Sequence, residues 1–467
     1  MFKNKVLMIT GGTGSFGNAV LKHFLNSDLK EIRIFSRDEK KQEDMRIEYK
    51  NDRLNFIIGN VRDFDSINNA MLGVDYVFHA AALKQVPSCE FYPMQAIRTN
   101  LYGAENVYDF SLGNPNVPAP DEVNEAIKNI VDEEESVVLH GYMSNSGFED
   151  VREAIAQSLN KRFDTHFNYT NIVMTVGAAG GLNTILKTII NPGDEVLTFA
   201  PFFGEYRNYV SNFGGKLVAV SPDTATFQPK FDEFEKLINK NTKAVIVNNP
   251  NNPTGVVYSE DTIKKLAKIM EDKQKELGIE IFLIADEPYR ELAYDGVEVP
   301  YLTKYYNNTI VGYSYSKSLS LPGERIGYLV IPDEAADSDD MKSAASVATR
   351  ILGFVNAPSL QQKVIARCLD AKVNIEAYDK NRKALYEGLT KLGFECVKPE
   401  GAFYLFVKSP TEDENIFCDT AKKHNILIVP GSSFGCAGFV RMAYCVSYDT
   451  IINSLPHFAE VAKEMGL

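Results

Sequence analysis

One stretch of sequence decides the fold of this chain: Ser314-Tyr315-Ser316-Lys317-Ser318-Leu319-Ser320-Leu321-Pro322-Gly323-Glu324-Arg325-Ile326-Gly327-Tyr328. The apolar, β-branched run before it, residues 309–313, predicts a buried strand, so we expect Lys317 on a loop between two elements. Small residues beside Lys317 leave room for a bulky group on its amine. Ser314 and Arg325 offer a hydroxyl and a planar, two-pronged donor, which suit a phosphate. The stretch therefore describes a lysine that forms an imine with a phosphorylated aldehyde.

This combination of serine, lysine, Pro-Gly and arginine resembles the pyridoxal-phosphate lysine signature of the class I/II aminotransferases, which have the aspartate-aminotransferase fold, fold type I. With the motifs described below, the resemblance extends over residues 105–467. It implies an α/β protein with a large α/β sheet domain, expected over residues 105–350, and a smaller α+β domain, expected over residues 351–467. The cofactor that it implies is pyridoxal 5'-phosphate.

The periodicity of apolar residues gives the expected elements of this part of the chain. Strands are predicted over residues 171–176, 195–199, 245–247 and 280–285, and near residues 399–406 and 439–444. Amphipathic helices are predicted over residues 182–190, 342–351 and 360–392. Strands that alternate with helices in this way are typical of α/β folds.

Four residues resemble those that hold the phosphate and the ring of the cofactor in this family. Ala178 and Ala179 lie at a predicted helix start, where backbone N–H groups face a phosphate. Phe203 follows a predicted strand at the position where the family stacks an aromatic ring on the pyridine. Tyr142 resembles the tyrosine that crosses to the cofactor phosphate of the partner subunit, so the resemblance implies a homodimer.

Three further residues match the family's contacts to the polar edge of the ring. Asn252 follows two Asn-Pro steps at a strand end, and its side-chain amide is placed to donate to the phenolate oxygen of the cofactor. Asp286 ends a buried strand, and a carboxylate there needs a partner, which in this family is the protonated pyridine nitrogen. Tyr289 would also bond the phenolate oxygen. We expect Lys317, Asp286 and Tyr289 to be the catalytic residues.

The substrate contacts are expected at four positions: Gly113, Asn252, Phe403 and Arg441. Gly113 resembles the small residue beside the substrate carboxylate, and Phe403 is a candidate for the wall of the substrate site. Arg441 lies inside an apolar strand, where an arginine is costly unless it is paired, and it resembles the residue that grips the substrate α-carboxylate.

The reaction that the resemblance implies is transamination between an amino acid and a 2-oxo acid. An amino acid displaces Lys317 from the imine, the freed lysine moves the α-proton, and hydrolysis releases a 2-oxo acid. A second 2-oxo acid then reverses these steps. No second arginine can be placed opposite a distal carboxylate, so the donor and acceptor of this chain stay open. Aspartate is only the most frequent guess for the family.

The first hundred residues carry a different pattern. A strand over residues 6–10 leads into a glycine-rich turn and then an amphipathic run over residues 18–26, and further strands are expected over residues 31–35, 55–59 and 74–79. Glycines spaced in this way allow a tight turn, close approach of a pyrophosphate and close packing of helix on strand. The candidate dinucleotide-binding residues are Gly11, Gly14, Ser15, Phe16, Gly17, Ser36 and Arg37.

The N-terminal pattern resembles the extended short-chain dehydrogenase/reductases, specifically the nucleotide-sugar 4,6-dehydratase group, over residues 3–107. We expect a truncated Rossmann-like NAD(P)-binding segment over residues 1–104, in which Arg37 would favour NADP by taking a ribose 2′-phosphate. The family's Tyr-x-x-x-Lys motif does not follow within a few dozen residues. Binding of NAD(P) is therefore doubtful, and a dehydratase activity is not expected.

The two patterns meet at residues 103–115, which resemble both families. We interpret the chain as two unrelated genes joined at a short shared motif, by recombination or by an assembly error. The N-terminal arm that aminotransferases of this kind carry is replaced, which puts substrate closure and dimer stability at risk. Two other readings stay open: a bifunctional sugar dehydratase and sugar aminotransferase, and a non-catalytic chimera that merely binds ligands.

Composition excludes several other functions. A net charge of −13 argues against nucleic acid as a partner. The six cysteines include no closely spaced pair, so no metal site is expected. No apolar run reaches the length of a membrane span, and the start of the chain has no signal-peptide cleavage region, so we expect no membrane partner and a cytoplasmic location.

Overall fold

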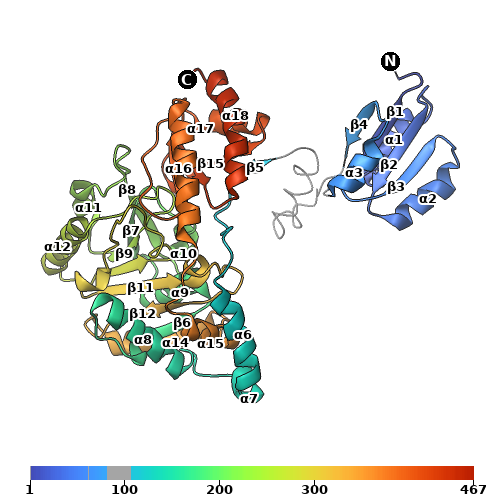
Figure 1. The fold of residues 1–467 in the computed structure, drawn as a ribbon. Coiled ribbons are helices and arrows are strands. Elements are labelled where there is room, and N and C mark those ends of the chain that lie inside the picture. The colour runs from blue at the N-terminus through green and yellow to red at the C-terminus, as the bar shows by residue number, and fades with distance from the viewer. Residues whose placement is uncertain (1, 62, 81–106) are drawn as a thin grey trace. The chain divides into compact units, whose positions relative to one another are not determined.

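The computed structural model describes residues 2–61, 63–80 and 107–467, and it divides the chain into two compact units, Met1–Val107 and Tyr108–Leu467 (Figure 1). Each unit has its own sheet and its own core, so each is described by itself. None of the helices within the described ranges is both long enough and apolar enough to cross a membrane.

The N-terminal unit contains a four-stranded parallel sheet in the order β3-β2-β1-β4. Its elements are β1 (Val6–Thr10), α1 (Ser15–Phe24), β2 (Glu31–Ser36), α2 (Glu39–Tyr49), β3 (Leu54–Ile58), α3 (Phe64–Met71) and β4 (Tyr76–His79). The alternation of strand and helix confirms the Rossmann-like pattern expected from the sequence. The observed strands lie within two residues of the expected ends.

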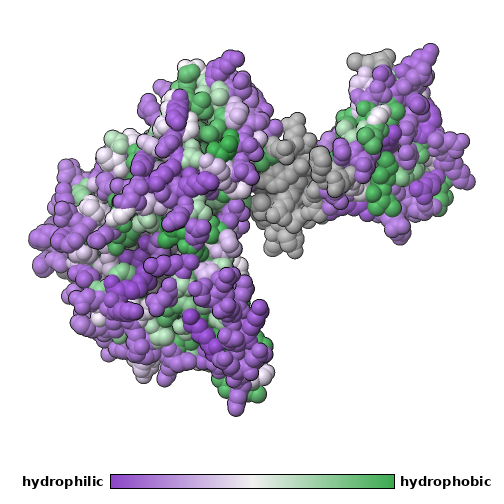
Figure 2. Space-filling model, in the orientation of Figure 1, coloured by the Kyte–Doolittle hydropathy of each residue, from purple (hydrophilic) through white to green (hydrophobic). Residues whose placement is uncertain are grey.

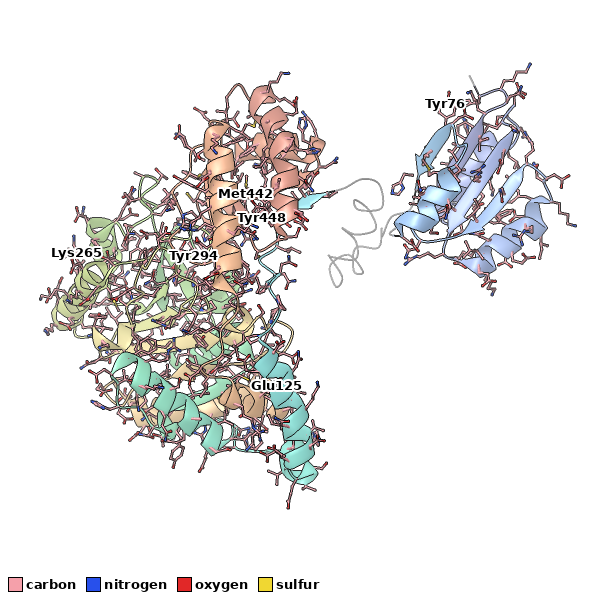
Figure 3. The ribbon with its side chains drawn as sticks, viewed as in Figure 1. Tyr76, Glu125, Lys265, Tyr294, Met442 and Tyr448 are labelled. Carbon is pink, nitrogen blue, oxygen red and sulfur yellow. The ribbon has the colours of Figure 1, made fainter. Side chains whose placement is uncertain are left out.

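The sheet of this unit is buried at its centre and open at the edge formed by β4. All five residues of β1 are buried. On β4, Tyr76 (Figure 3) is 36% exposed and Val77 is 43% exposed. Successive strand residues point to opposite faces, so both faces of this edge strand reach the surface. Figure 2 shows hydrophobic residues at the surface of this unit among the hydrophilic ones.

The C-terminal unit is built on a seven-stranded sheet in the order β6-β12-β11-β10-β9-β7-β8. The strands are β6 (Ile172–Thr175), β7 (Glu195–Phe199), β8 (Lys216–Val220), β9 (Thr242–Asn248), β10 (Phe282–Asp286), β11 (Thr309–Ser314) and β12 (Gly327–Val330). Only β12 runs antiparallel to its neighbours. Every residue of β10 and β11 is buried, because helices cover the sheet on both faces.

The helices of this unit cover the large sheet and connect its strands (Figure 1). They are α6 (Asp121–Glu133), α7 (Ser136–His140), α8 (Glu149–Phe163), α9 (Gly177–Ile189), α10 (Tyr206–Ser211), α11 (Phe231–Leu237), α12 (Glu260–Leu277), α13 (Tyr315–Ser318), α14 (Ser338–Ile351) and α15 (Ser359–Arg367), with short 3₁₀ turns at Tyr169–Asn171 and Leu302–Lys304. Helix α9 packs on β11 and β12 and against α14, while α8 packs on β6.

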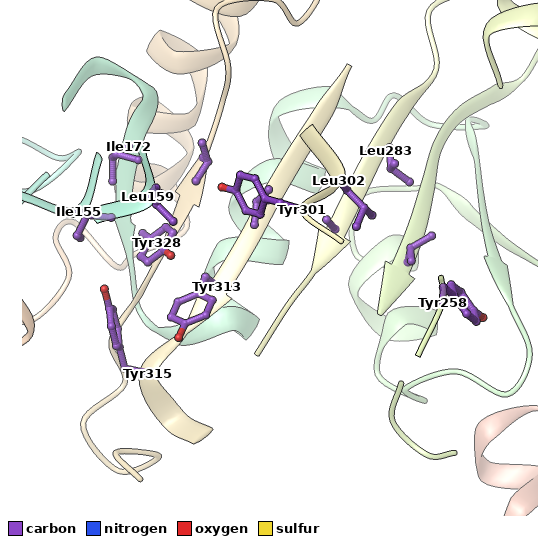
Figure 4. Close-up of a cluster of buried hydrophobic side chains, with 14 of the residues drawn as sticks. Ile155, Leu159, Ile172, Tyr258, Leu283, Tyr301, Leu302, Tyr313, Tyr315 and Tyr328 are labelled. Atoms are coloured by element: carbon purple, nitrogen blue, oxygen red, sulfur yellow. The ribbon is translucent and has the colours of Figure 1, made fainter. Parts of the chain in front are cut away.

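Aromatic and aliphatic side chains fill the core on the α8 side of the sheet. Tyr313, Tyr315 and Tyr328 lie together there, with Ile155 and Leu159 of α8 close by (Figure 4). The rings of Tyr313 and Tyr328 stack with centroids 4.9 Å apart. This packing fixes the strand and the turn that carry the lysine signature.

A smaller antiparallel sheet, in the order β13-β16-β15, forms the rest of the C-terminal unit. Its strands are β13 (Tyr404–Lys408), β15 (Val429–Pro430) and β16 (Phe439–Ala443), and it packs with α16 (Ile375–Lys391), α17 (Glu414–Lys423) and α18 (Tyr448–Glu464). Strand β5 (Tyr108–Asp109) pairs with β14 (Ile426–Leu427). Residues just after the junction of the two patterns therefore belong to the smaller sheet region, together with residues more than 300 positions later.

The structure corrects three of the expected elements. Lys317 lies in the one-turn helix α13 and not on a loop, because the Ser314 side chain accepts a hydrogen bond from Ser316 N and starts a turn. Helix α9 begins at Gly177, earlier than expected, since Gly177 takes a left-handed backbone (φ +68°) that turns the chain directly into the helix. The helix expected over residues 360–392 is two helices, α15 and α16. Asn374 caps the second one by accepting from Ala377 N.

Candidate active site

A cavity of about 350 Å³ opens where three neighbouring parallel strands of the large sheet end. The last residues of β9, β10 and β11 are Asn248, Asp286 and Ser314, and all three line it. The remaining lining residues come from the segments after β5, β7, β9 and β10, from α9, α10 and α13, from the turn after α13 and from the small sheet: Ser111, Leu112, Gly113, Ala178, Ala179, Leu182, Phe203, Tyr209, Asn252, Pro288, Tyr289, Ser316, Lys317, Pro322, Arg325, Tyr404 and Arg441. Strand ends of open α/β sheets are the usual place for such sites.

The Asp286 carboxyl is buried with one oxygen unpartnered. Its Oδ2 accepts a 2.5 Å hydrogen bond from the Tyr206 hydroxyl, and Asn248 Nδ2 donates to its main-chain oxygen at 2.8 Å. Within the described part of the chain, Oδ1 has no hydrogen-bond partner. Burial raises the pKa of Asp286 to about 7, although the bond from Tyr206 opposes this shift. A cationic or N–H group placed in the cavity would supply the missing partner.

The Lys317 amine enters the same cavity from α13. Its Nζ donates to the main-chain oxygen of Gly113 at 2.8 Å. Burial, together with the positive charges of Arg325 and Arg441 and against the opposing effect of Cys445, lowers the pKa of Lys317 from the usual 10.5 to about 8. A larger share of this amine is therefore neutral and nucleophilic near neutral pH than for a lysine in water.

A second cavity, of about 310 Å³, lies on the other side of α13. Tyr315 and Ser318 of this helix line it, together with the paired Arg162 and Glu291. The same one-turn helix presents Ser316 and Lys317 to the first cavity. The amine and the buried carboxyl of Asp286 thus meet in the first cavity, which is the candidate active site.

One end of the active-site cavity is suited to a phosphate. The hydroxyls of Ser314 and Ser316 lie 2.7 Å apart at this end. A Cβ built on Gly177 would come within 2.9 Å of Arg325 Nη2, so the missing side chain lets the guanidinium lie against the start of α9. The 13-residue helix directs its N-terminal N–H groups and its positive dipole end to the same place.

The other end of the cavity holds a buried arginine that is only partly paired. Arg441 is 9% exposed; its Nη2 donates to Ser111 O at 2.7 Å and its Nη1 donates to Asn252 Oδ1 at 3.2 Å. Its buried Nε makes no hydrogen bond with any described residue. The guanidinium lies 4.6 Å from the centroid of the Tyr404 ring. A guanidinium with a donor left over is suited to a small carboxylate.

Two tyrosine hydroxyls lie between these ends. The hydroxyl oxygens of Tyr289 and Tyr404 are 2.9 Å apart, and both side chains are buried. Burial raises the pKa of Tyr289 well above its usual value and raises that of Tyr404 to about 12. Both groups therefore stay protonated and act as hydrogen-bond donors.

The family model described as "Aminotransferase class I and II" matches residues 105–454, about three quarters of the chain. The chain belongs to the class I/II aminotransferase family. The C-terminal unit is accordingly called the aminotransferase unit from here on, and the family's fold-type-I architecture agrees with the seven-stranded sheet and the smaller sheet region.

Relatives of the aminotransferase unit match over nearly their whole length. A probable aspartate/prephenate aminotransferase of Aquifex aeolicus is 30% identical over 373 residues, which cover 77% of this chain and 92% of that protein. A crystal structure of an amino transferase from Eubacterium rectale is 48% identical with a TM-score of 0.78, covering 86% of this chain and 99% of its own. The Thermus thermophilus aspartate aminotransferase with maleate is 26% identical with a TM-score of 0.71, covering 82% and 97%.

The N-terminal unit has relatives of another kind. A family model described as "Polysaccharide biosynthesis protein" matches residues 7–116. A UDP-glucose 4-epimerase of Rickettsia prowazekii is 70% identical over 118 residues, or 24% of this chain. The chain spans 35% of the length of that epimerase. The two family models overlap at residues 105–116, within the segment whose sequence resembles both families.

Most residues expected at the aminotransferase site line the cavity: Gly113, Ala178, Ala179, Phe203, Asn252, Asp286, Tyr289, Ser314, Lys317, Arg325 and Arg441. Two do not. Tyr142 is 94% exposed on the surface of the subunit. Phe403 is fully buried and does not line the cavity, although Lys317 Nζ lies 5.1 Å from its ring. The next residue, Tyr404, lines it instead, because neighbouring residues at a strand point to opposite sides.

Among the lining or supporting residues that were not expected from the sequence are Tyr206, Tyr209, Asn248 and Tyr404. Asn248 is the last residue of a strand and precedes the Asn-Pro steps, so its position was a signal that could have been used. Tyr206 closes the aromatic run that contains Phe203, and its hydroxyl reaches Asp286 from the start of α10. Periodicity alone gave no sign that this hydroxyl faces the carboxyl.

The expected phosphate-binding turn of the N-terminal unit has the required local geometry. Gly11 takes φ +65°, and a Cβ on Gly17 would lie 2.6 Å from Gly12 Cα, so the helix packs closely on the turn. Ser36 Oγ bonds Thr13 Oγ1 at 2.7 Å, and Arg37 is exposed. Gly14 is the N-cap of α1, while the side chains of Ser15 and Phe16 lie outside the described part of the structure.

Proposed function

We propose that this protein transfers an amino group between an amino acid and a 2-oxo acid, with pyridoxal phosphate held at Lys317. The observation that carries the proposal is that the amine of Lys317 and the unpartnered Oδ1 of Asp286 belong to one cavity. The membership of the family supports the cofactor, and the chemistry of the lining residues fits it.

Several polar groups of the cavity are placed to hold the ring nitrogen and the phosphate of pyridoxal phosphate. Asp286 Oδ1 would hold a proton on the ring nitrogen, and the pairing would return the pKa of this carboxyl to a low value. Ser314, Arg325 and the first N–H groups of α9 would hold the phosphate, with Ala178 and Ala179 leaving room for it. When bound, pyridoxal phosphate supplies a ring that draws electrons from the bonds of the substrate α-carbon.

The remaining cavity residues position the ring and the substrate. Phe203 would lie against the ring face, and Tyr289 and Asn252 would donate to its phenolate oxygen. Lys317, with its pKa lowered to about 8, would act as the base that takes the proton from the α-carbon of the substrate. That carbon would need to lie within reach of Nζ.

Arg441 supports one of the candidate substrate classes. Its partly paired, buried guanidinium suits an α-carboxylate, which amino acids have and keto-sugars lack. This favours an amino-acid aminotransferase over a sugar aminotransferase, despite the sugar-nucleotide relatives of the N-terminal unit. The names of the relatives favour aspartate as one donor. A paired dehydratase or epimerase activity is not proposed, because the chain spans about a third of the epimerase that it matches.

The proposed working unit is a homodimer. Tyr142 is a polar aromatic side chain that stands 94% exposed, and Val137 and Val138 of α7 beside it are also exposed. A second copy that covers this surface would bury these side chains and bring Tyr142 to the phosphate end of its partner's cavity. Sedimentation analysis of the wild type would test the dimer. The contact of Tyr142 would be tested by the Kd for pyridoxal phosphate, which should be lower in the wild type than in Tyr142→Phe.

A visible absorption spectrum of the purified protein tests the proposed function. We expect a band on addition of pyridoxal phosphate, a shift of the band when aspartate or alanine is added, and transamination in a coupled assay. Lys317→Ala should lose the band and the activity together, by about 10⁴-fold in rate. The matched control is Lys372→Ala, which removes a lysine that lines the second cavity beyond α13 and should keep both.

Two results would count against the proposal. Turnover retained by Lys317→Ala would remove the lysine from the chemistry. If the band of the wild type stays unchanged with every amino acid tested, the chain is better explained as a non-catalytic chimera. A nucleotide keto-sugar that accepts the amino group better than any 2-oxo acid would favour the sugar aminotransferase.

A further inference from the structure

Tyr404 lies next to both Tyr289 and Arg441 in the candidate site. It is the first residue of β13, it is 3% exposed, and its hydroxyl lies 2.9 Å from that of Tyr289. Its ring lies under the guanidinium of Arg441, with 4.6 Å from the ring centroid to Cζ.

Tyr404 also lies against Gly113, whose main-chain oxygen accepts a hydrogen bond from Lys317. A Cβ built on Gly113 would lie 2.0 Å from the Tyr404 hydroxyl oxygen, closer than any real contact. Gly113 must therefore lack a side chain because the hydroxyl end of Tyr404 occupies that space. The main-chain oxygen of the same glycine accepts from Lys317 Nζ at 2.8 Å. One tyrosine thus borders the carboxylate end, the lysine and Tyr289.

The hydroxyl pair has a preferred direction once Tyr289 acts on the cofactor. Two phenols in contact share one hydrogen bond, so one hydroxyl donates and the other keeps its hydrogen for a different acceptor. Burial keeps both groups protonated at neutral pH. If Tyr404 donates to Tyr289, the Tyr289 hydrogen is left for the phenolate oxygen, and the first bond polarises the second and strengthens it.

We propose that Tyr404 is a positioning residue, which aims the Tyr289 hydroxyl at the cofactor phenolate and holds Arg441 flat for the substrate carboxylate. This inference rests on the proposed function. The two roles belong to different parts of the side chain. The hydroxyl acts through Tyr289, and the ring acts through Arg441 by a cation–π contact.

Two substitutions separate these roles. Tyr404→Phe removes the hydroxyl and keeps the ring under Arg441. In a pH titration of the visible band of the pyridoxal-phosphate-bound protein, we expect its apparent pKa to rise by about 0.5 unit, because a weaker donor stabilises the phenolate less. Tyr289→Phe should raise it further in the same direction. The KM for the amino donor should change little in Tyr404→Phe.

Tyr404→Leu removes the ring as well. The KM for amino donors should then rise by up to about tenfold, because Arg441 loses one of its two aromatic neighbours and keeps only the Phe434 ring, whose centroid lies 4.7 Å from its Cζ. Tyr444→Phe is the matched control: this tyrosine is fully buried near the same strand, donates to Ala402 O at 3.2 Å and does not line the cavity. It should move neither the band nor KM, and thermal unfolding of all four variants shows whether each is folded.

The outcomes are distinct. If the apparent pKa of the band changes in Tyr289→Phe but not in Tyr404→Phe, the proposed role of the Tyr404 hydroxyl is wrong. An unchanged KM in Tyr404→Leu overturns the ring role. Absence of any band from the wild type refutes the proposed function itself, and the inference falls with it.

Discussion

The two sheets of this chain differ in how completely they are enclosed. In the aminotransferase unit, every residue of β10 and β11 is buried, and the strands end in Asp286 and Ser314 at the active-site cavity. In the N-terminal unit, β4 is a parallel strand with exposed residues on both faces, and it forms an open edge. Parallel strands are normally covered on both sides.

The comparison shows how burial changes the chemistry of residues at the end of a strand. Burial is what raises the pKa of Asp286 and lowers that of Lys317, and both shifts follow from the removal of water. The glycine-rich turn of the N-terminal unit has the right backbone, yet it stands in a unit that covers about a third of its relative.

The largest effect that would sharpen this comparison is expected at Asp286. Asp286→Asn keeps the shape of the side chain and removes the charge that would pair with the protonated ring nitrogen. We expect kcat/KM to fall by about 10²- to 10³-fold, because losing one partner of a buried charge pair costs roughly 2–5 kcal/mol. Steady-state kinetics with excess cofactor measure this.

The control for Asp286 is an aspartate of the open sheet. Asp75 pairs with Lys5 at 2.7 Å on the surface of the N-terminal unit. Asp75→Asn should leave the transamination rate unchanged, since exposed ion pairs contribute little. An equal loss of activity in both variants would break the comparison.

The next effect is on stability as a function of pH, in the absence of cofactor. The pKa of Lys317 is about 8 in the folded protein and 10.5 in the unfolded chain, so the unfolded state binds more protons between these values. Stability should rise with pH across the window from 8 to 10.5, by up to about 3 kcal/mol, and the destabilisation is fully present below pH 8. Urea unfolding of the aminotransferase unit measures it.

Lys317→Met should abolish that rise and leave the slope of stability against pH unchanged below pH 8. The lysine of the open sheet gives the contrast: the hydrogen bond with Asp75 raises the pKa of Lys5 instead of lowering it. A rise between pH 8 and 10.5 that persists in Lys317→Met would show that another group carries it.

The smallest effects come from a matched pair of valines, one in each sheet. Val311 of β11 is 1% exposed and Val77 of β4 is 43% exposed. Val311→Thr puts a hydroxyl into the core and should cost about 1–3 kcal/mol, because the hydroxyl is left without water. Val77→Thr should change stability by less than about 0.5 kcal/mol. Denaturant unfolding monitored separately for each unit compares them, and equal losses would mean that β4 is as enclosed as β11.

The sequence was sufficient for the parts of the fold and site that leave a local signal. Lys317 stands in a rare motif, Asp286 ends a buried apolar run, and Arg441 interrupts one. Asp286 and Arg441 are polar residues where apolar ones are expected, and Lys317 is marked by its motif, so the position of each carried information. The strands that hold them were located for the same reason, since buried parallel strands read as short apolar runs.

The rest depended on contacts between distant residues. The side-chain direction at the start of β13 changes with every residue, so a shift of one position exchanged Phe403 for Tyr404. The chain has 23 tyrosines, and no pattern tells which hydroxyl reaches Asp286 or Tyr289. The pairing of β5 with β14 joins residues more than 300 positions apart, which periodicity does not reveal.

Reduction of the cofactor-bound protein with borohydride, followed by mass spectrometry of its peptides, tests the central claim most directly. The claim is that the enclosed end of the large sheet binds pyridoxal phosphate through one lysine. We predict a single modified peptide that carries the reduced cofactor on Lys317. Modification of a different lysine, or of many lysines to a similar extent, would contradict it.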